Sequence, residues 1–577
     1  MYKRVIIAVA DGARADLMKQ LLDAGELPHL KEHLVDRGCY RTALTVFPST
    51  TGPAHIPFVS GLHPGTANVP GYRWLSRKTH DEHRRSFYRH RTLNGFRGLM
   101  VGRDMDPATS TSLFEYYDRP SSVLELIDYC STQPLYKIVV RRLLRVVQAH
   151  RSDDWSRVDE LVERQIIKRI KAGSECIIGS FFGIDEYSHL YEPFHEKSKA
   201  AYRNIDRAIG RIAGVLKELG YYENTIIAVV SDHGLSETKV HIPLVDLVRD
   251  HGFNPHYYPR MYRKAHDCAV LESGNAMAAL YFKRGDRWGK HWQHSELAGD
   301  ERISRLTNTL LNTAGVSFLV SRDGHDGIVF SGQAGVLRAV RDGDRYHIAV
   351  EGEDPLKGHP TGTFTRRELL EQTYDATYPD AVNQLFMLFG SERSGDIAIS
   401  SEPGYDLRLQ HEDPEHHGSH GSLHREHMQV PLLTNLPIAD EHLHNYDLAA
   451  TILAATGKQP RCQLDGRVLS LQNGSDPLQQ FDQSGSAGDD RGGAPKKSSD
   501  LTSILATVAI ILSGLIITAL FREEILGYGS HLMETYGKTY VDVVLFLLTA
   551  VSSTPLALPI WAYSLVGIAL GYHVIRL

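Results

Sequence analysis

The stretch Val5-Ile6-Ile7-Ala8-Val9-Ala10-Asp11-Gly12 decides the fold of this 577-residue chain. Six consecutive apolar residues, several of them β-branched, are typical of a strand that is covered on both faces of a sheet. The run is too short for the apolar part of an export signal, so we interpret it as a buried strand of a cytosolic domain. It delivers Asp11 at its carboxyl end.

Two later runs repeat this pattern. Cys176–Phe182 ends shortly before Asp185, and Thr225–Val230 ends at Ser231-Asp232. Helical patterns are expected at residues 14–36, 155–171 and 197–219. Alternating strands and helices predict an α/β fold with a mostly parallel sheet and helices on both faces. Because ligands bind beyond the carboxyl ends of such strands, we expect the three aspartates at one site.

The chain divides into five predicted regions. The α/β core occupies residues 1–250, residues 251–400 form an inserted cap rich in antiparallel strands, the core continues over 401–472, residues 473–500 are a flexible linker, and 501–577 anchor the chain in a membrane. Short alternating stretches separated by Gly and Asp predict the cap strands. The core is expected to resume close to Asp396-Ile397-Ala398-Ile399.

An uncharged segment near the C-terminus predicts contact with a lipid bilayer. Leu501–Phe521 holds 21 residues without a charge, which is about 31 Å as a helix and enough to span a bilayer. Val543–Tyr572 is also uncharged but carries Pro555 and Pro559, so the number of spans stays open. We expect a C-terminal anchor in the cell membrane, with the preceding domain on its cytoplasmic side.

Composition excludes some classes of function. A formal net charge of -6 argues against a protein that binds nucleic acid polymers. The five cysteines are scattered without C-x-x-C spacing, so we expect free thiols.

Two segments of the chain are rich in basic residues. Residues 135–149 predict a basic amphipathic helix. Residues 73–103 include nine Lys or Arg residues but only two acidic residues. This segment is either a solvated loop or a surface that attracts an anionic substrate or anionic lipid head groups.

A candidate nucleophile lies in the stretch Phe47–His55. Thr51 stands there in a turn bounded by Pro and Gly, where a helix cap is the ordinary interpretation. Asp185-x-x-x-His189, Asp232-His233 and His420 in Gly418–Ser422 offer carboxylates and imidazoles at predicted strand ends. Each pattern alone is common on protein surfaces, but their coincidence predicts a divalent metal site beside Thr51.

These motifs, in their order, look like those of the alkaline phosphatase superfamily. They resemble most the type I phosphodiesterase and nucleotide pyrophosphatase branch, over about residues 1–240 and 400–470. The residues that carry the resemblance are Asp11-Gly12, Phe47-Pro48-x-x-Thr51 with Pro53 and His55, Gly61-Leu62-x-Pro64, Asp185-x-x-x-His189, Ser231-Asp232-His233-Gly234, Ser419-His420-Gly421, Met428–Leu432, Asp447–Gly457 and Asp465-Gly466.

The resemblance implies a site for two divalent ions, zinc being expected. One would be held by Asp185, His189 and His420, and the other by Asp11, Asp232 and His233 with the oxygen of Thr51. It also implies hydrolysis of phosphodiester or nucleotide pyrophosphate bonds in small anionic substrates, through a covalent phosphothreonine at Thr51. A metal would lower the pKa of the otherwise weakly nucleophilic hydroxyl, and a pair of ions about 4 Å apart can clamp both reacting oxygens. His416, His417 and His424 lie near His420 in the sequence, and the Gly-flanked His420 fits the motif best.

The chain departs from the family pattern at one position. An asparagine downstream of the nucleophile is expected to bind the phosphate oxygen, but the register places Tyr72 there, with Asn68 four residues earlier. Both are candidate substrate-binding residues, and the choice between diester and monoester stays open. The alternatives are a phosphomonoesterase or phosphonate hydrolase with the same site, or a non-catalytic membrane-tethered scaffold. The oligomeric state is open.

Overall fold

A computed structural model of the chain describes residues 2–82, 90–93, 102, 104–105, 109–128, 136–137, 149, 152–258, 266–407 and 415–472. The predicted linker, 473–500, and the predicted anchor, 501–577, lie outside these residues. Among the helices that are described, none combines the length and the apolar character needed to cross a bilayer.

A seven-stranded sheet forms the core, in the order β2-β21-β8-β1-β7-β5-β6. Its strands are β1 (Arg4–Ala10), β2 (Cys39–Leu44), β5 (Ser121–Val123), β6 (Tyr136–Lys137), β7 (Cys176–Phe181), β8 (Thr225–Val230) and β21 (Gln429–Thr434). Strand β1 lies between β7 and β8 and is parallel to both, whereas β21 is antiparallel to both of its neighbours. The mostly parallel sheet is therefore confirmed, within a fold of mixed sheets.

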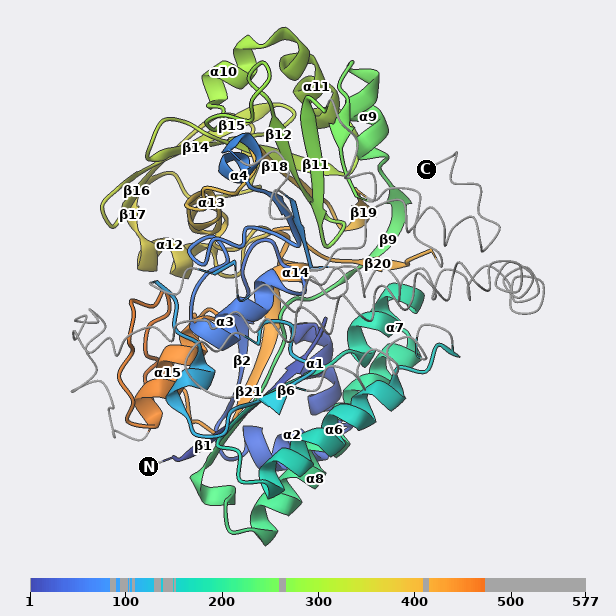
Figure 1. Cartoon of the computed structure of the whole chain (residues 1–577), viewed down its shortest axis with the longest axis vertical. Helices are drawn as coiled ribbons and strands as arrows, with labels where there is room; N and C mark the ends of the chain where they lie inside the picture. The colour runs from blue at the N-terminus through green and yellow to red at the C-terminus, as the bar shows by residue number, and fades with distance from the viewer. Residues whose placement is uncertain are drawn as a thin grey trace, which may run out of the picture. The chain divides into compact units, whose positions relative to one another are not determined.

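Helices cover both faces of this sheet, as predicted (Figure 1). Ile6, Ala8 and Ala10 of β1 pack into one cluster with α1 (Ala15–Asp23), α6 (Ser156–Lys171) and α8 (Glu196–Glu218). The alternate residues Val5, Ile7 and Val9 join a second cluster with α3 (Ile56–Ser60) and α15 (Asp447–Ala455). Alternate side chains of a strand point to opposite faces, so burial on both sides explains the uninterrupted apolar run.

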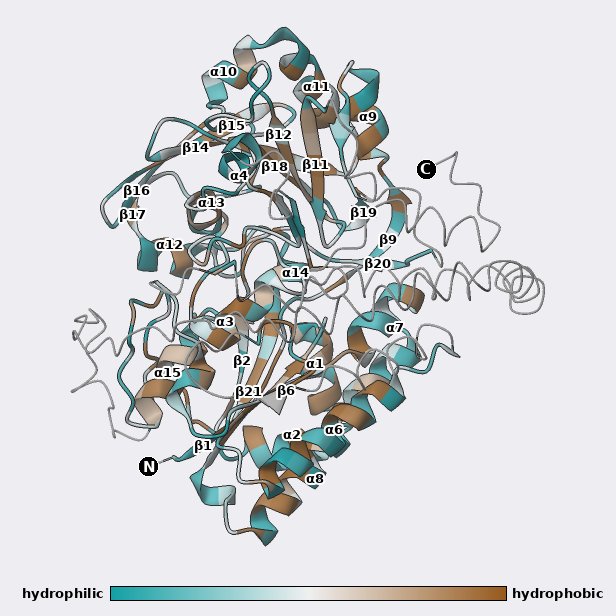
Figure 2. Cartoon of the chain, viewed as in Figure 1, coloured by the Kyte–Doolittle hydropathy of each residue, from teal (hydrophilic) through white to brown (hydrophobic). Residues whose placement is uncertain are grey.

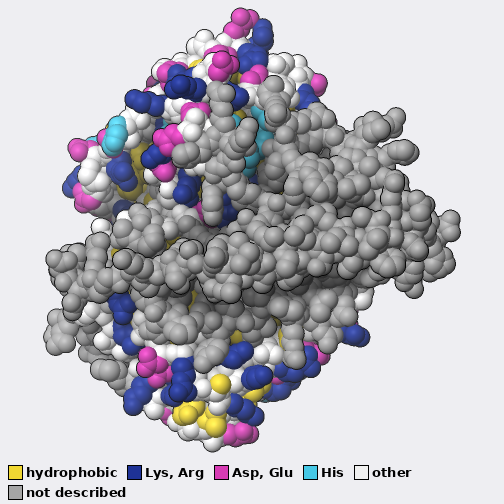
Figure 3. Space-filling model, in the orientation of Figure 1, with side chains coloured by type: hydrophobic (Ala, Val, Ile, Leu, Met, Phe, Trp, Pro, Cys, Tyr) yellow, Lys and Arg dark blue, Asp and Glu magenta, His cyan; other side chains and the backbone are white. Residues whose placement is uncertain are grey.

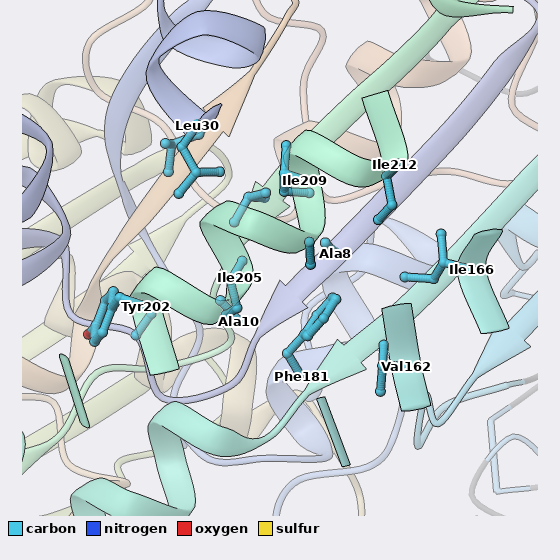
Figure 4. Close-up of a cluster of buried hydrophobic side chains, with 14 of the residues drawn as sticks. Ala8, Ala10, Leu30, Val162, Ile166, Phe181, Tyr202, Ile205, Ile209 and Ile212 are labelled. Carbon is cyan, nitrogen blue, oxygen red and sulfur yellow. The ribbon is translucent and has the colours of Figure 1, made fainter. Parts of the chain in front are cut away.

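The longest helix, α8, shows how the helices attach. Ile205, Ile209 and Ile212 recur on one side of α8 and lie in the same buried cluster as Ala8 and Phe181 of the sheet (Figure 4). In Figure 2, α6 and α8 carry hydrophobic residues toward the sheet and hydrophilic residues on the outer side. This spacing is that of an amphipathic helix.

The N-terminal helical segment is interrupted. The helix predicted over residues 14–36 ends with α1 at Asp23, and the chain resumes as α2 (Pro28–Leu30) and the π-helix η1 (Lys31–Val35). Gly25 has a φ of 73°, a left-handed conformation that ends a helix, and Pro28 starts the next one. Of the predicted basic helix 135–149, residues 136–137 instead form strand β6, and the rest lies outside the described residues except residue 149.

A second, nine-stranded sheet is built mainly from residues 255–401, in the order β10-β11-β12-β18-β13-β14-β15-β16-β17. Its strands are β10 (Pro255–His256), β11 (Cys268–Ser273), β12 (Met277–Phe282), β13 (Val316–Arg322), β14 (Gly327–Ser331), β15 (Gly335–Asp342), β16 (Arg345–Gly352), β17 (Gly362–Thr365) and β18 (Ile397–Ser401). All pairs except β10–β11 are antiparallel.

One boundary prediction was wrong. Residues 397–399 do not return the chain to the core but lie in β18, between β12 and β13 of the second sheet. The apolar run Ile397–Ile399 resembles a core strand because β18 is itself buried between neighbours. The seven-stranded sheet regains the chain only at β21.

The other described elements lie between or beside the strands of the two sheets. They are β3 (Arg73–Leu75), β4 (His90–Thr92), β9 (Ser236–His241), β19 (Gly404–Asp406), β20 (Gly418–Ser419), α4 (Arg77–Glu82), α7 (Gly183–Tyr191), α9 (Leu244–Asp250), α10 (His294–Gly299), α11 (Glu301–Leu311), α12 (Arg366–Thr373), α13 (Ala381–Phe389), α14 (Arg425–Met428), and the 3-10 helices η2 (Pro53–His55), η5 (Leu113–Tyr116) and η6 (Tyr222–Asn224).

Two arginines of the basic segment 73–103 are buried instead of solvated. Arg77 pairs with Asp396 at 2.7 Å, and Arg91 Nε donates to both carboxylate oxygens of Asp104 at 2.9 Å. Elsewhere on the surface, Figure 3 shows Lys and Arg side chains interspersed with Asp and Glu among the described residues of that face. Four of the five cysteines are described, and none of these four forms a disulfide.

Candidate metal and nucleophile site

Three adjacent strands deliver the acidic residues of the site. Asp232 follows β8 and Asp11 follows β1, while Asp185 lies in the first turn of α7, just after β7. All three carboxylates are buried. The predicted meeting of these aspartates at one sheet edge is what the structure shows.

The first predicted ligand set comes together. Asp185, His189 and His420 each place one ligand atom within 4.8 Å of the others. His189 lies one helical turn after Asp185 in α7, and His420 follows β20, which β9 holds in place by antiparallel pairing. Gly274 also shapes this set, because an added Cβ there would lie 2.5 Å from His420 Nδ1.

The second predicted set surrounds Thr51. His233 Nε2 lies 3.5 Å from Asp11 Oδ1 and 3.3 Å from Asp232 Oδ2. Thr51 Oγ1 lies 2.9 Å from His233 Nε2 and 3.3 Å from Asp11 Oδ1. Asp11, Asp185 and His233 also form a group with ligand atoms within 4.8 Å, so the two sets are contiguous.

Backbone carbonyls set the tautomers of the three histidines. The Nδ1 atoms of His189, His233 and His420 contact the carbonyl oxygens of Gly418 at 2.7 Å, Gly234 at 3.2 Å and Ser49 at 3.1 Å. A carbonyl oxygen can only accept, so each Nδ1 carries the proton and each Nε2 keeps its lone pair. This is the arrangement that orients metal-binding imidazoles.

The electrostatics of the site favour a bound cation. Burial, followed by the neighbouring carboxylates, raises the pKa of Asp11 and of Asp185 well above the usual value. Burial likewise lowers the pKa of His233 to about 4 and that of His420 well below its usual value, so both imidazoles are neutral. Asp11 Oδ2 and Asp185 Oδ1 are buried without hydrogen-bond partners among the described residues. Buried carboxylates beside neutral imidazoles fit divalent cations.

A supporting pair was not assigned by the sequence. His55 Nε2 lies 3.1 Å from Asp232 Oδ2, and its Nδ1 lies 2.7 Å from Glu125 Oε1. Burial opposes protonation of His55, but the Glu125 and Asp232 carboxylates outweigh it and raise its pKa well above the usual value. Both nitrogens are therefore occupied, and His55 orients Asp232. His55 belongs to the Thr51 motif, whereas Glu125 lies in no motif.

The two predicted substrate-binding residues lie at the border with the second sheet. Asn68 accepts a hydrogen bond from Ser391 Oγ at 2.6 Å and donates to Glu392 Oε1 at 3.5 Å. Tyr72 is half-buried, and its backbone N donates to Ser273 Oγ at 2.9 Å. Both polar ends of the Asn68 side chain are thus engaged by residues 391–392, and a phosphate-binding role for either residue stays a prediction.

Of the other histidines near His420, His416 also adjoins the first ligand set, whereas His424 does not. The His416 ring centroid lies 4.6 Å from that of His189, and His424 Nδ1 accepts from Glu426 N at the start of α14. The ring of His420 instead stacks on His233 at 3.7 Å. Among the described residues, the ligand atoms that group with those of Asp185 and His189 belong to His420 and not to His416 or His424, so position favours the predicted His420.

Comparison with known proteins gives the following matches. A family model described as type I phosphodiesterase/nucleotide pyrophosphatase matches residues 5–423. No curated protein matches the chain. Among solved structures, murine ectonucleotide pyrophosphatase/phosphodiesterase 5 is similar with a TM-score of 0.48 and 13% identity, over 81% of this chain and 97% of that chain. Phosphonoacetate hydrolase from Sinorhizobium meliloti 1021, in complex with phosphonoformate, has a TM-score of 0.47 and 16% identity, over 78% and 95%.

Proposed function

This chain belongs to the type I phosphodiesterase/nucleotide pyrophosphatase family of hydrolases, and we propose that it cleaves phosphodiester or pyrophosphate bonds with Thr51 as the nucleophile. The observation that carries the proposal is the position of Thr51 Oγ1, 2.9 Å from His233 Nε2 and 3.3 Å from Asp11 Oδ1. A threonine in an ordinary helix cap would bond to backbone N–H groups instead.

Six side chains would hold two divalent ions. Asp185, His189 and His420 suit one ion; Asp11, Asp232 and His233, together with Thr51 Oγ1, suit the other. The mixture of imidazole and carboxylate donors favours zinc. When bound, the ions would act as Lewis acids that lower the pKa of the hydroxyl and neutralise charge on the phosphoryl oxygens.

The chain's own residues define the reaction at Thr51. Thr51 Oγ1 lies 2.9 Å from His233 Nε2 and 3.3 Å from Asp11 Oδ1, so its oxygen is placed beside two of the proposed metal ligands. Attack forms the Oγ1–P bond as the bond from phosphorus to the leaving-group oxygen breaks, and the hydroxyl proton of Thr51 is released with the leaving group. Water then cleaves the Oγ1–P bond: its oxygen bonds to phosphorus, and one of its protons restores the Thr51 hydroxyl.

Replacement of Thr51 tests the proposal. Thr51→Ala is expected to abolish turnover of a p-nitrophenyl phosphodiester while leaving the melting temperature and metal content close to wild type. Thr51→Ser keeps the hydroxyl and is the matched control, expected to retain part of the activity. Rapid acid quenching followed by peptide mass spectrometry should find the transferred phosphoryl group on the peptide that contains Thr51. Undiminished turnover by Thr51→Ala would remove Thr51 from the mechanism.

A phosphomonoesterase or phosphonate hydrolase with the same residues is the second candidate. The contacts of Asn68 with Ser391 and Glu392 favour keeping it, because they occupy a side chain predicted to bind the diester phosphate. Rates on aryl phosphate monoesters and diesters with the same leaving group separate the two candidates. A higher kcat/KM for the monoester would select the second.

Location is a separate proposal that rests on composition. The uncharged segment Leu501–Phe521 would tether the enzyme to the cell membrane, with its catalytic domain on the cytoplasmic side. The full chain is expected to stay with membranes during alkaline extraction, whereas a chain ending at residue 475 should be released. Release of both would contradict the tether, and protease protection of the domain in intact cells tests its side.

A further inference from the structure

Arg73 is a nearly buried cation with few partners. Its side chain is 12% exposed, and its closest acid atom, Glu272 Oε2, lies 3.7 Å from Nη1. Its one described hydrogen bond, from Nη1 to the Glu272 carbonyl oxygen, is long at 3.5 Å. Among the described residues, Nε has no hydrogen-bond partner. A guanidinium presents five donors, so most of the binding capacity of Arg73 remains for a ligand.

Two tyrosine rings flank the guanidinium. Its central carbon lies 5.3 Å from the centroid of the Tyr72 ring and 4.7 Å from that of Tyr258. Cation–π contacts of this kind restrain the position of an arginine without using its hydrogen-bond donors. Tyr258 is 36% exposed, so this arrangement reaches the surface. The rings therefore hold a cation in place while its N–H groups stay available.

This cation lies beside the metal and nucleophile site. Arg73 and Tyr72 contact Glu272 and Ser273 at the end of β11. Gly274 follows directly, and its carbonyl oxygen accepts from His420 N at 3.3 Å. Two residues of chain span at most about 7 Å, so the backbone that contacts Arg73 lies within roughly that distance of the backbone that contacts His420.

The two other arginines of this segment that the structure describes lack this freedom. Arg77 is tied to Asp396, and Arg91 is tied to Asp104, each through short hydrogen bonds in the interior. In each of these pairs the neighbouring carboxylate neutralises the charge of the guanidinium. Among these three buried or nearly buried arginines, Arg73 is the one with weak acid contacts.

We propose that Arg73 binds a second anionic group of the substrate, of the phosphoryl class, while the reacting phosphorus lies at Thr51. The inference rests on the proposed function, because it names the residue that binds the non-reacting ester arm of the same substrate. Arg73 is thereby a specificity-determining residue: it favours phosphodiesters whose ester arm carries a further negative charge over those with a neutral arm. Guanidinium N–H groups match the geometry of phosphoryl oxygens.

The test uses two p-nitrophenyl phosphodiesters that share the leaving group. The second ester arm is ethyl in one and ethyl with a terminal phosphonate in the other. In the wild-type full chain, kcat/KM is expected to favour the phosphonate-bearing diester. In Arg73→Gln, kcat/KM should fall roughly 10- to 100-fold for that diester, which matches the loss of a charged hydrogen bond, and by less than about 3-fold for the ethyl diester. Equal losses on both diesters, or no loss, would overturn the assignment.

A control and a second variant complete the design. Arg249 also lies over a tyrosine ring, Tyr257 at 4.9 Å, so Arg249→Gln controls for the loss of an arginine–tyrosine contact and should leave the substrate preference unchanged. Glu272→Gln removes the carboxylate that competes for Arg73 and should raise the preference for the phosphonate-bearing diester; this holds as a test even if Arg73→Gln does not fold. A lowered or unchanged preference in Glu272→Gln would contradict the proposal.

Binding measurements separate this inference from the proposed function. If the wild-type chain hydrolyses neither diester, phosphodiester hydrolysis fails, and calorimetric binding of the phosphonate-bearing diester decides the role of Arg73. Binding that weakens at least 10-fold in Arg73→Gln, in line with a charged hydrogen bond, supports the anion contact without turnover. Binding equal in both proteins refutes it.

Discussion

Replacing Glu125 by glutamine tests whether a buried chain of charges positions Asp232. Glu125 holds His55 at 2.7 Å and also accepts hydrogen bonds from Ser180 Oγ at 2.8 Å and from Ile127 N at 3.2 Å. Burial opposes ionisation of Glu125, but the charge and hydrogen bond of His55 outweigh burial and lower its pKa, so the carboxylate is charged. Glu125→Gln keeps the size and an acceptor oxygen while it removes the charge that supports protonated His55.

The expected magnitude follows from the geometry. A neutral His55 would contact Asp232 through an ordinary hydrogen bond, which is about half as strong as the charge-assisted one in the wild type. Loss of a group that orients a metal ligand typically lowers metal affinity or activity by roughly 10- to 100-fold. Glu125→Gln should therefore weaken zinc binding by that factor, and activity should recover partly in excess zinc.

The assay is a chelator competition for zinc, together with kcat/KM at limiting and saturating zinc. Glu163 is the matched control, because it is also a buried glutamate paired with a base, Arg211, but lies in α6. Glu163→Gln is expected to leave zinc affinity unchanged. If the two variants bind zinc equally well, the proposed support of Asp232 through His55 is refuted.

Three further predictions address backbone, metal and pH. Gly12→Ala places a Cβ 2.9 Å from the Cα and Cβ of Asp185 at a φ of +73°, so it should lower kcat/KM roughly 100-fold by displacing Asp185, a proposed metal ligand. Gly214→Ala, with open space around it, is the control and should leave kcat/KM unchanged. A fully active Gly12→Ala would show that the site tolerates the shift. Zinc added to the metal-free protein at pH 7 should release protons, because the pKa of Asp11 and of Asp185 is raised well above the usual value in the absence of a cation. Calorimetry in buffers of different ionisation enthalpy measures the number of protons released. A binding enthalpy that is the same in every buffer would contradict the predicted release. Burial raises the pKa of Asp159 to about 7 although two backbone N–H groups donate to it. Because this folded-state pKa lies above the unfolded one, the stabilisation is present at pH 4 and is lost as pH rises through about 7. The free energy of unfolding of Asp159→Asn should therefore gain on that of wild type between pH 5 and pH 8 by on the order of a few kcal/mol, and a constant difference between the two proteins would refute the raised pKa.

Much of the site was predictable because its residues follow strands that the sequence marks strongly. Apolar runs at β1, β7 and β8 are long enough to be recognised, and parallel neighbours end at the same edge. Asp11, Asp185 and Asp232 therefore converge without knowledge of distant contacts. The identity of β18 was not predictable in this way, because a buried strand has the same composition in either sheet.

Local patterns along the chain thus indicated the α/β architecture, and with the family resemblance they indicated the six candidate metal ligands and the candidate nucleophile, since each lies in a run of residues close in sequence. Only the tertiary structure decided which side chains support them. Glu125 reaches His55 across 70 residues, Asn68 meets residues 391–392, and Arg73 lies between two tyrosines that are far apart in the chain. Such contacts arise from packing between elements and between the two sheets. Packing produces no periodic pattern in the sequence from which these contacts could be predicted.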